Sequence, residues 1–127
     1  MDEDGRRETV LGIGGVFFKG HDADGLAHWY EGHLGILGTG QSYDDPVWEQ
    51  EAGPTVIAAF GPEHWESPYL GPRGFGINFR VRDLDAIVAQ LRADGVEVEV
   101  DDEVYPNGRF AQLSDPEGNA IQLWQSM

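Results

Sequence analysis

Histidines and carboxylates are the side chains of this sequence with the clearest capacity for chemistry. The histidines are His21, His28, His33 and His64. His28 and His33 stand five residues apart, which on a helix turns their side chains away from one shared face. A metal site that joins His21 to Glu49 or Glu51 is one interpretation. Surface histidines on an acidic protein are the other, and we favour it.

Other familiar catalytic patterns are missing from the sequence. There is no cysteine, which excludes a disulfide framework, a thiolate nucleophile and a cysteine-based zinc site. The serines do not lie in a nucleophile elbow. The glycines at 12–15 lack the strand-then-helix context of a nucleotide-binding loop. The acidic run at 97–103 alternates with valine and lacks the spacing of a calcium loop.

The charge balance limits the possible partners. The 127 residues carry a formal net charge of -15. Nucleic acids and anionic membranes need a basic surface, so neither is expected as a partner. No apolar run approaches the ~20 residues of a membrane helix. The charged start, MDEDGRRE, is unlike a signal peptide. We expect a cytoplasmic protein whose residues 1–7 are frayed.

The second half of the chain predicts a strand, a helix and further strands. Residues 75–81 alternate between apolar and other residues, as in a strand. Asp83 is a candidate N-cap for an apolar helical stripe that ends at Gly95. Residues 96–101 alternate Val with acidic residues, which indicates a strand with one solvated face. The stretch 108–125 then predicts a hairpin whose turn is Asp-Pro-Glu-Gly-Asn.

The first half predicts a similar order of elements. Residues 10–19 alternate as a Gly-rich strand. Asp22 or Asp24 can cap a helix over 26–34, and Gly35 is a plausible C-cap. Short strands are expected at 46–49 and 55–60. We therefore expect one domain over residues 8–126, with a first module at about 9–63, a Pro/Gly-rich connector at about 61–74 and a second module at about 74–126.

The closing hairpin carries a family resemblance. The residues Asp115, Pro116, Gly118, Asn119, Ile121 and Leu123 form a DPxGN turn that leads into an apolar strand. This stretch, with the segment 79–85, resembles the vicinal oxygen chelate superfamily of glyoxalase I, bleomycin resistance proteins and extradiol dioxygenases. The resemblance implies an α+β fold of two βαβββ modules, whose curled mixed sheet surrounds a cavity with helices on its outer face. It also implies a homodimer.

The resemblance further implies four metal-ligand positions. Carried over one at a time, they fall on Gly15, on Ala58 or Ala59, on Gly76 and on Gln122. A divalent metal needs three or more protein ligands in a fixed geometry. Only Gln122 has a donor side chain, so no metal is expected at the family's usual place and no cofactor is predicted.

Strand parity within the family's fold predicts which side chains line the cavity. Val16, Phe18, Ile77, Phe79, Val81, Ile121 and Leu123 are expected to face the helices, and Gly15 and Gly76 would leave room in the cavity floor. The expected ligand-binding residues are Phe17, Lys19, Trp48, Asn78, Arg80, Phe110, Gln122 and Trp124. Aromatic surface with a few polar groups is typical of small-molecule pockets. Catalytic residues are not identified.

Three functions follow from these expectations. The first is a metal-free protein that binds a small organic molecule, as bleomycin-resistance-type proteins do by sequestration. The alternative is a glyoxalase-like lyase or isomerase, or a dioxygenase, that holds Zn, Ni, Mn or Fe through displaced ligands. The third is a structural or regulatory module that only dimerises, through surfaces such as Trp65 and Tyr69 in the connector. The sequence does not name the ligand.

Overall fold

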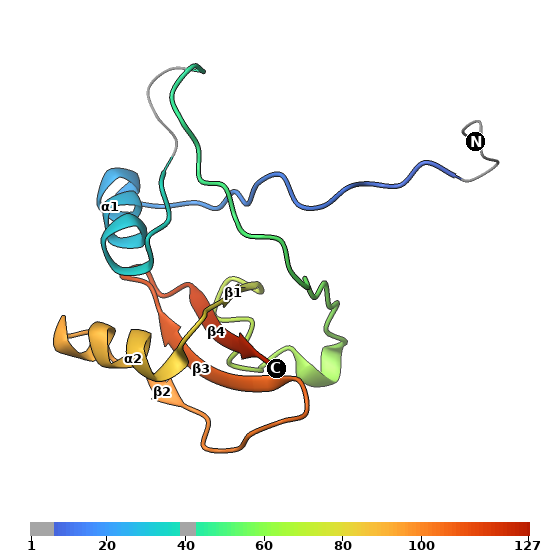
Figure 1. Ribbon diagram of the computed structural model, residues 1–127, viewed down its shortest axis with the longest axis vertical. Helices are drawn as coiled ribbons and strands as arrows, with labels where there is room; N and C mark the ends of the chain where they lie inside the picture. The colour runs from blue at the N-terminus through green and yellow to red at the C-terminus, as the bar shows by residue number, and fades with distance from the viewer. Residues whose placement is uncertain (1–6, 39–42) are drawn as a thin grey trace.

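The structure is a computed structural model that describes residues 7–38 and 43–127 (Figure 1). Its helices are α1 (Ala23–Leu34), the short 3-10 helix η1 (Pro62–His64) and α2 (Leu84–Ala93). Its strands are β1 (Gly76–Arg80), β2 (Glu99–Val100), β3 (Gly108–Ser114) and β4 (Ala120–Ser126). Within the described ranges, no helix has the length and apolar composition needed to span a bilayer. Of the expected frayed end, only Arg7 lies among the described residues.

The second module forms one four-stranded sheet. The strand order is β1-β4-β3-β2, with β1 parallel to β4 and the other neighbours antiparallel. The expected strand, helix and closing hairpin are all present, and the α+β class is confirmed. The predicted strand at 96–101 is shorter than expected, because only Glu99 and Val100 pair regularly with β3. Beyond them the backbone N–H of Asp101 still donates to the carbonyl oxygen of Phe110 at 3.0 Å.

Both longer helices begin and end where their sequences indicate. The carboxylate of Asp22 accepts from the backbone N–H of Gly25, and Gly35 ends α1 at a φ of 72°, where glycine is favoured. The carboxylate of Asp83 accepts from Ala86 N–H at the start of α2. These caps confirm the predicted boundaries.

Both helices pack against the same face of the sheet. The buried apolar residues of α2 are Leu84, Val88 and Leu91, and those of the sheet are Ala111, Leu113, Ile121 and Leu123. Leu26 and Tyr30 of α1 join this cluster, with Phe79 packed against it. Because the side chains of β3 and β4 alternate, the intervening residues face the opposite side. The predicted parity is therefore confirmed for Ile121, Leu123 and Phe79.

The strands expected in the first module do not form within the described residues. The segments 10–19, 46–49 and 55–60 run as extended chain without a pairing partner, so these three predictions are wrong for this single chain. Their residues suit a strand, but a strand also needs a neighbour for its N–H and C=O groups. The apolar side chains remain in solvent: Val10 is 90% exposed, Phe17 94% and Ile57 79%.

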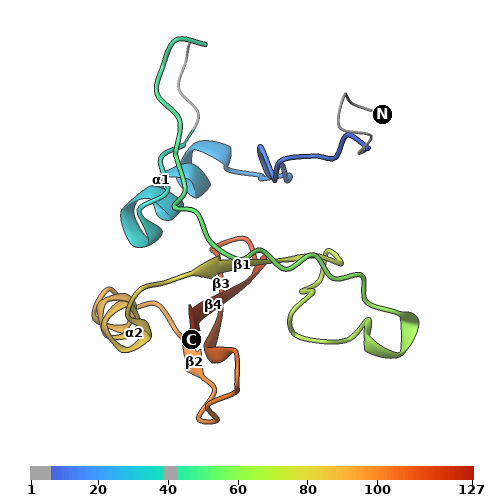
Figure 2. The same cartoon turned by 45° about the vertical axis from the view of Figure 1, so that its right-hand side comes forward.

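The sheet is consequently open. Figure 2 shows the segment between α1 and η1 running past β1, where the guanidinium of Arg80 donates to the carbonyl oxygen of Glu51 at 2.7 Å. Regular pairing of β1 among the described residues is with β4 alone. Two complete modules would enclose a cavity. Here the sheet of one module and two extended segments border that space without enclosing it.

Candidate functional site

The side of the sheet that faces away from α1 and α2 gathers most of the residues predicted to bind a ligand. We call it the open face, and its residues are Gly76, Asn78, Arg80, Phe110, Gln112, Ala120, Gln122 and Trp124. The strand register aligns them in rows. Asn78, Gln122 and Gln112 are direct neighbours in one row, and Arg80, Trp124 and Phe110 are direct neighbours in the next.

The first row is a set of side-chain amides. Asn78 Nδ2 donates to Gln122 Oε1 at 2.6 Å, and Gln112 Nε2 donates to the carbonyl oxygen of Pro68 at 3.2 Å. Gln112 Oε1 is buried and has no hydrogen-bond partner among the described residues. A buried acceptor without a partner costs free energy. The row therefore consists of hydrogen-bonded amides and one buried acceptor that lacks a partner among the described residues.

The second row is aromatic. The rings of Phe110 and Trp124 stack with centroids 6.1 Å apart and an interplanar angle of 8°, and Tyr105 meets Phe110 edge-on at 5.8 Å. Trp124 is only 8% exposed, and its indole N–H donates to the carbonyl oxygen of Asn107 at 2.8 Å. These contacts fix the Trp124 ring, so the row is a preformed apolar surface.

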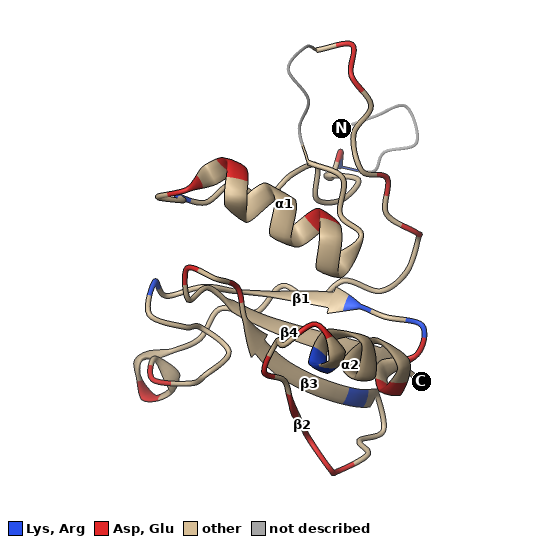
Figure 3. Cartoon of the chain, turned by 90° about the vertical axis from the view of Figure 1, so that its left-hand side faces the viewer, with Lys and Arg blue, Asp and Glu red and all other residues tan. Residues whose placement is uncertain are grey.

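Arg80 is the last residue of β1, and Figure 3 shows the end of this strand as basic. The acidic residues are spread over helices and connecting segments. Arg80 borders a pocket of about 550 Å³. The rest of the lining comes from the two extended segments: Leu11, Gly12, Ile13, Gly14, Gln50, Glu51, Ala52, Gly53 and Thr55. The guanidinium occupies the space that a Cβ on Gly53 would need.

Three predicted site residues do not lie on the open face. Phe17 extends into solvent, and Lys19 has an exposed side chain. Trp48 instead packs edge-on against Phe79, with centroids 6.5 Å apart. All three belong to first-module segments that lack a strand partner here. The prediction that they bind ligand thus depends on those segments pairing.

The residues at the family's metal-ligand positions do not fit a metal centre. A Cβ on Gly76 would overlap the carbonyl oxygen of Tyr69, so this position has no room for a ligating side chain. Gln122 Oε1 already accepts from Asn78. Nowhere in residues 7–38 and 43–127 do three or more His, Cys, Asp or Glu side chains gather as a metal site would require. This holds for the site postulated around His21 as well.

A polar network surrounds the β3–β4 turn. The sequence predicts the turn itself but not this network. Asp115 is 4% exposed, and its Oδ2 accepts from Tyr30 Oη and from Asn119 Nδ2, both at 2.7 Å. Its Oδ1 accepts from the backbone N–H groups of Glu117 and Asn119. Burial, and then the hydrogen bond to Asp115, raise the pKa of the Tyr30 phenol. The carboxylate therefore ties α1 to the hairpin.

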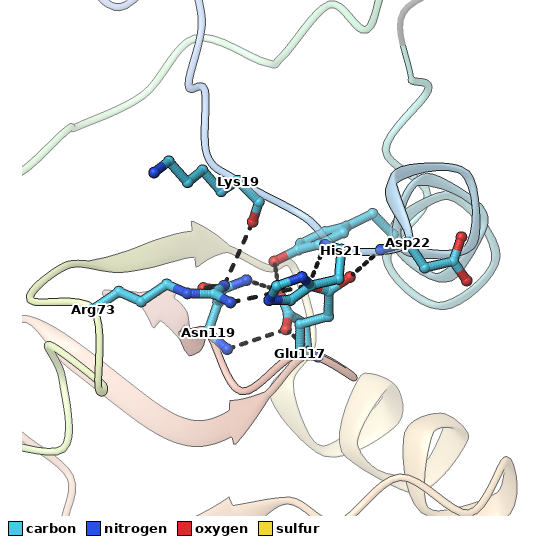
Figure 4. Close-up of polar contacts among 8 residues, drawn as sticks. Lys19, His21, Asp22, Arg73, Glu117 and Asn119 are labelled. Carbon is cyan, nitrogen blue, oxygen red and sulfur yellow. Dashed lines mark hydrogen bonds and ion pairs between the residues drawn. The ribbon is translucent and has the colours of Figure 1, made fainter.

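Glu117 makes the second half of this connection (Figure 4). Its carboxylate accepts from the backbone N–H groups of His21 at 2.7 Å and Asp22 at 2.9 Å, at the start of α1. Arg73 from the connector donates to Asn119 Oδ1 at 2.6 Å and to the carbonyl oxygen of Lys19 at 3.5 Å. The sequence signal for this network is two carboxylates within a turn motif, and their partners at α1 lie 85 to 96 residues away.

The comparisons with known proteins agree with this architecture. The model of the Glyoxalase/Bleomycin resistance protein/Dioxygenase superfamily matches residues 16–123. The chain belongs to this superfamily. A search among curated proteins gave no match.

Three solved structures are similar to the chain. An antibiotic binding protein from Streptomyces sp. CB03234, TnmS3, is 27% identical over 84% of this chain and 88% of that one, with a TM-score of 0.52. A putative glyoxalase family protein from Bacillus anthracis is 17% identical over 96% and 100%, with a TM-score of 0.57, and shares the fold. A glyoxalase/bleomycin resistance protein from the same Streptomyces is 44% identical over 39% and 43%, with a TM-score of 0.36. The chain thus aligns with less than half the length of this last protein.

The Glu117 contact predicts an acid-sensitive attachment of α1. The hydrogen bonds from Asp22 and then His21 lower the pKa of Glu117 below its ordinary value of 4.5. A lowered folded-state pKa contributes stability that is present above the ordinary pKa and is lost as the pH falls through the folded value. Urea unfolding should show Glu117→Gln less stable than wild type near about pH 6, with the difference shrinking near about pH 3.

The control is Glu66→Gln, which makes the same change of charge at an exposed position of the connector. A Glu117→Gln deficit that stayed constant from neutral to acid pH, after correction by this control, would contradict the role given to the ionised carboxylate.

Proposed function

We propose that this protein binds a small organic molecule on the open face and sequesters it without the metal centre typical of its superfamily. The observation that carries the proposal is the row of amides beside a preformed aromatic row, at a place where Gly76 leaves no room for a metal ligand. Apolar surface with a few oriented polar groups suits a ring system with a few polar substituents. Asn78 and Gln122 would orient such a molecule.

The comparisons support a binding role. TnmS3, a relative alignable over most of both chains, is described as an antibiotic binding protein. By this likeness the ligand class would include antibiotics. Lyase, isomerase or dioxygenase chemistry would need a Zn, Ni, Mn or Fe site with displaced ligands, because Gln122 is the one donor side chain at the family positions.

We further propose a homodimer in which a second copy completes the site. The two extended segments expose apolar side chains, some of them on consecutive residues such as Val56 and Ile57, and β1 has a free edge among the described residues. Such an edge, beside unpaired extended chain, is a template for strand addition. In the dimer the segment 10–19 would pair with β1 of the other copy, and Phe17 and Lys19 would reach the partner's open face. Nucleic acid remains an unexpected partner because of the net charge of -15.

The binding role predicts ligand-induced stabilisation. A panel of antibiotics and aromatic metabolites should contain compounds that raise the unfolding midpoint, by an amount equivalent to about 2.7 kcal/mol at 100 times the dissociation constant. Gln122→Ala should weaken the binding of these compounds. Gln90→Ala on the exposed side of α2 is the matched control. A panel without any stabilising compound, in a protein that remains dimeric, would favour the purely structural module instead.

The metal-free assignment predicts the composition of the purified protein. Protein prepared without a His-tag and without chelator should hold less than about a tenth of an equivalent of Zn, Ni, Mn or Fe, because a single amide oxygen cannot hold these ions. Metal analysis checks this directly. About one equivalent, lost on Gln122→Ala, would overturn the assignment and direct attention to lyase and dioxygenase assays.

The dimer predicts a variant that separates the chains. Sedimentation should show two chains per particle, and the double variant Phe17→Asp/Ile57→Asp should sediment as one chain, because it places charge on the apolar segments that must pair. Trp65→Ser in the connector is the control: it should leave the dimer intact. A dimer lost with Trp65→Ser and kept by the double variant would place the interface on the connector.

A further inference from the structure

Arg80 has no carboxylate partner among the described residues of this strongly acidic protein. The chain has 23 Asp and Glu residues and eight Lys and Arg residues. In the part of the chain that the structure describes, the arginine ion pairs join Arg109 to Asp85 at 3.0 Å and Arg73 to Glu117 at 4.0 Å. Arg80 makes no such pair there, and its Nη2 donates to a main-chain carbonyl oxygen, that of Glu51. A guanidinium carries five N–H donors, so most of its capacity remains.

Arg80 lies beside an open hollow that exposed residues of the two extended segments line. Arg80 is half-buried and borders the pocket of about 550 Å³. Gly12 and Gly14 line the same pocket and have open space where a Cβ would lie, so a ligand can approach their main chain closely. Glu51 also lines it and is the one carboxylate there, with its carbonyl oxygen toward Arg80.

The neighbours of Arg80 on the open face add apolar and neutral polar surface. Trp124 is its direct neighbour in the register, and Phe110 stacks on Trp124. Asn78 lies two residues before Arg80 on the same strand. A single positive charge therefore stands between an aromatic row and a wall rich in main chain.

We propose that Arg80 recognises an oxyanion, such as a carboxylate or sulfonate, carried by an aromatic ligand of the open face. This inference rests on the proposed binding function and specifies its ligand class. With a net charge of -15 the protein repels anions in general, so it binds one only where a local cation offsets that repulsion. The planar guanidinium fork matches the two oxygens of such a group.

Two dyes that share one ring skeleton test the inference. 1-Anilinonaphthalene-8-sulfonate carries an oxyanion, and N-phenyl-1-naphthylamine lacks it. Saturable fluorescence titrations of both dyes would compare wild type with Arg80→Gln, which keeps hydrogen-bond donors but removes the charge. Arg82→Gln removes the same charge from an exposed arginine just after β1 and is the matched control.

We expect Arg80→Gln to raise the dissociation constant of the sulfonate dye about tenfold or more and to leave that of the neutral dye within about twofold. Arg82→Gln should change neither by more than about twofold. Arg80→Lys, which keeps the charge but loses the planar fork, should raise the dissociation constant of the sulfonate dye more than about threefold and spare the neutral dye. This variant serves as the readout if Arg80→Gln fails to fold.

The failures are distinguishable. Equal losses of the sulfonate dye in Arg80→Gln and Arg82→Gln, or no loss in either, would overturn the role of Arg80 while leaving the binding function intact. An Arg80→Lys variant that changes the binding of both dyes equally, or of neither, would do the same. If neither dye saturated a site on wild type, both the binding function and the inference would fall.

Discussion

The buried carboxylate of Asp115 is the interaction on which the rest of the structure depends. It accepts four hydrogen bonds, two from backbone N–H groups of its own turn, one from the Asn119 amide and one from Tyr30 of α1. A buried charge is tolerated only when its hydrogen-bonding capacity is met. The same group thus shapes the β3–β4 turn and attaches the first module's helix to the second module's sheet. With Glu117 at the start of α1, it fixes which face of the sheet the helices cover and hence which face stays open.

The second module could be predicted from sequence because its signals are local. Asp83 and Gly95 bracket α2, the DPxGN turn sets the hairpin, and period-2 alternation then assigns each side chain of β4 to a face. Asn78, Arg80, Gln122 and Trp124 accordingly share a face as expected. Gln112 was not chosen as a site residue, although the same alternation places it beside Gln122. Asp115 was missed as well, because its partner Tyr30 lies 85 residues away and no local pattern indicates such a contact.

In the first module, the sequence pattern does not predict whether the strands pair. The alternation at 10–19 and the apolar run at 55–60 indicate segments suited to a sheet, but they do not supply the neighbouring strand. Here those segments leave Val10, Phe17 and Ile57 in solvent, which is unfavourable for apolar side chains. Sequence and structure agree if the missing neighbour belongs to another copy of the chain. The proposed site then contains residues of both copies, and its affinity for ligand depends on protein concentration.

The proposed absence of a metal centre is related to the position of charge on the open face. A metal centre needs donor side chains that converge on one point, and Gly76 is held against the Tyr69 carbonyl so closely that no side chain can stand there. Arg80 is the one charged side chain of the open face, and its guanidinium is held by a main-chain oxygen without an ion pair to an acid of the described chain. A fold that in a metal enzyme would orient a substrate through a cation at its centre can here orient a ligand through a cation at its edge. Binding would then need charge and shape but no exchangeable coordination site, which is sufficient for sequestration.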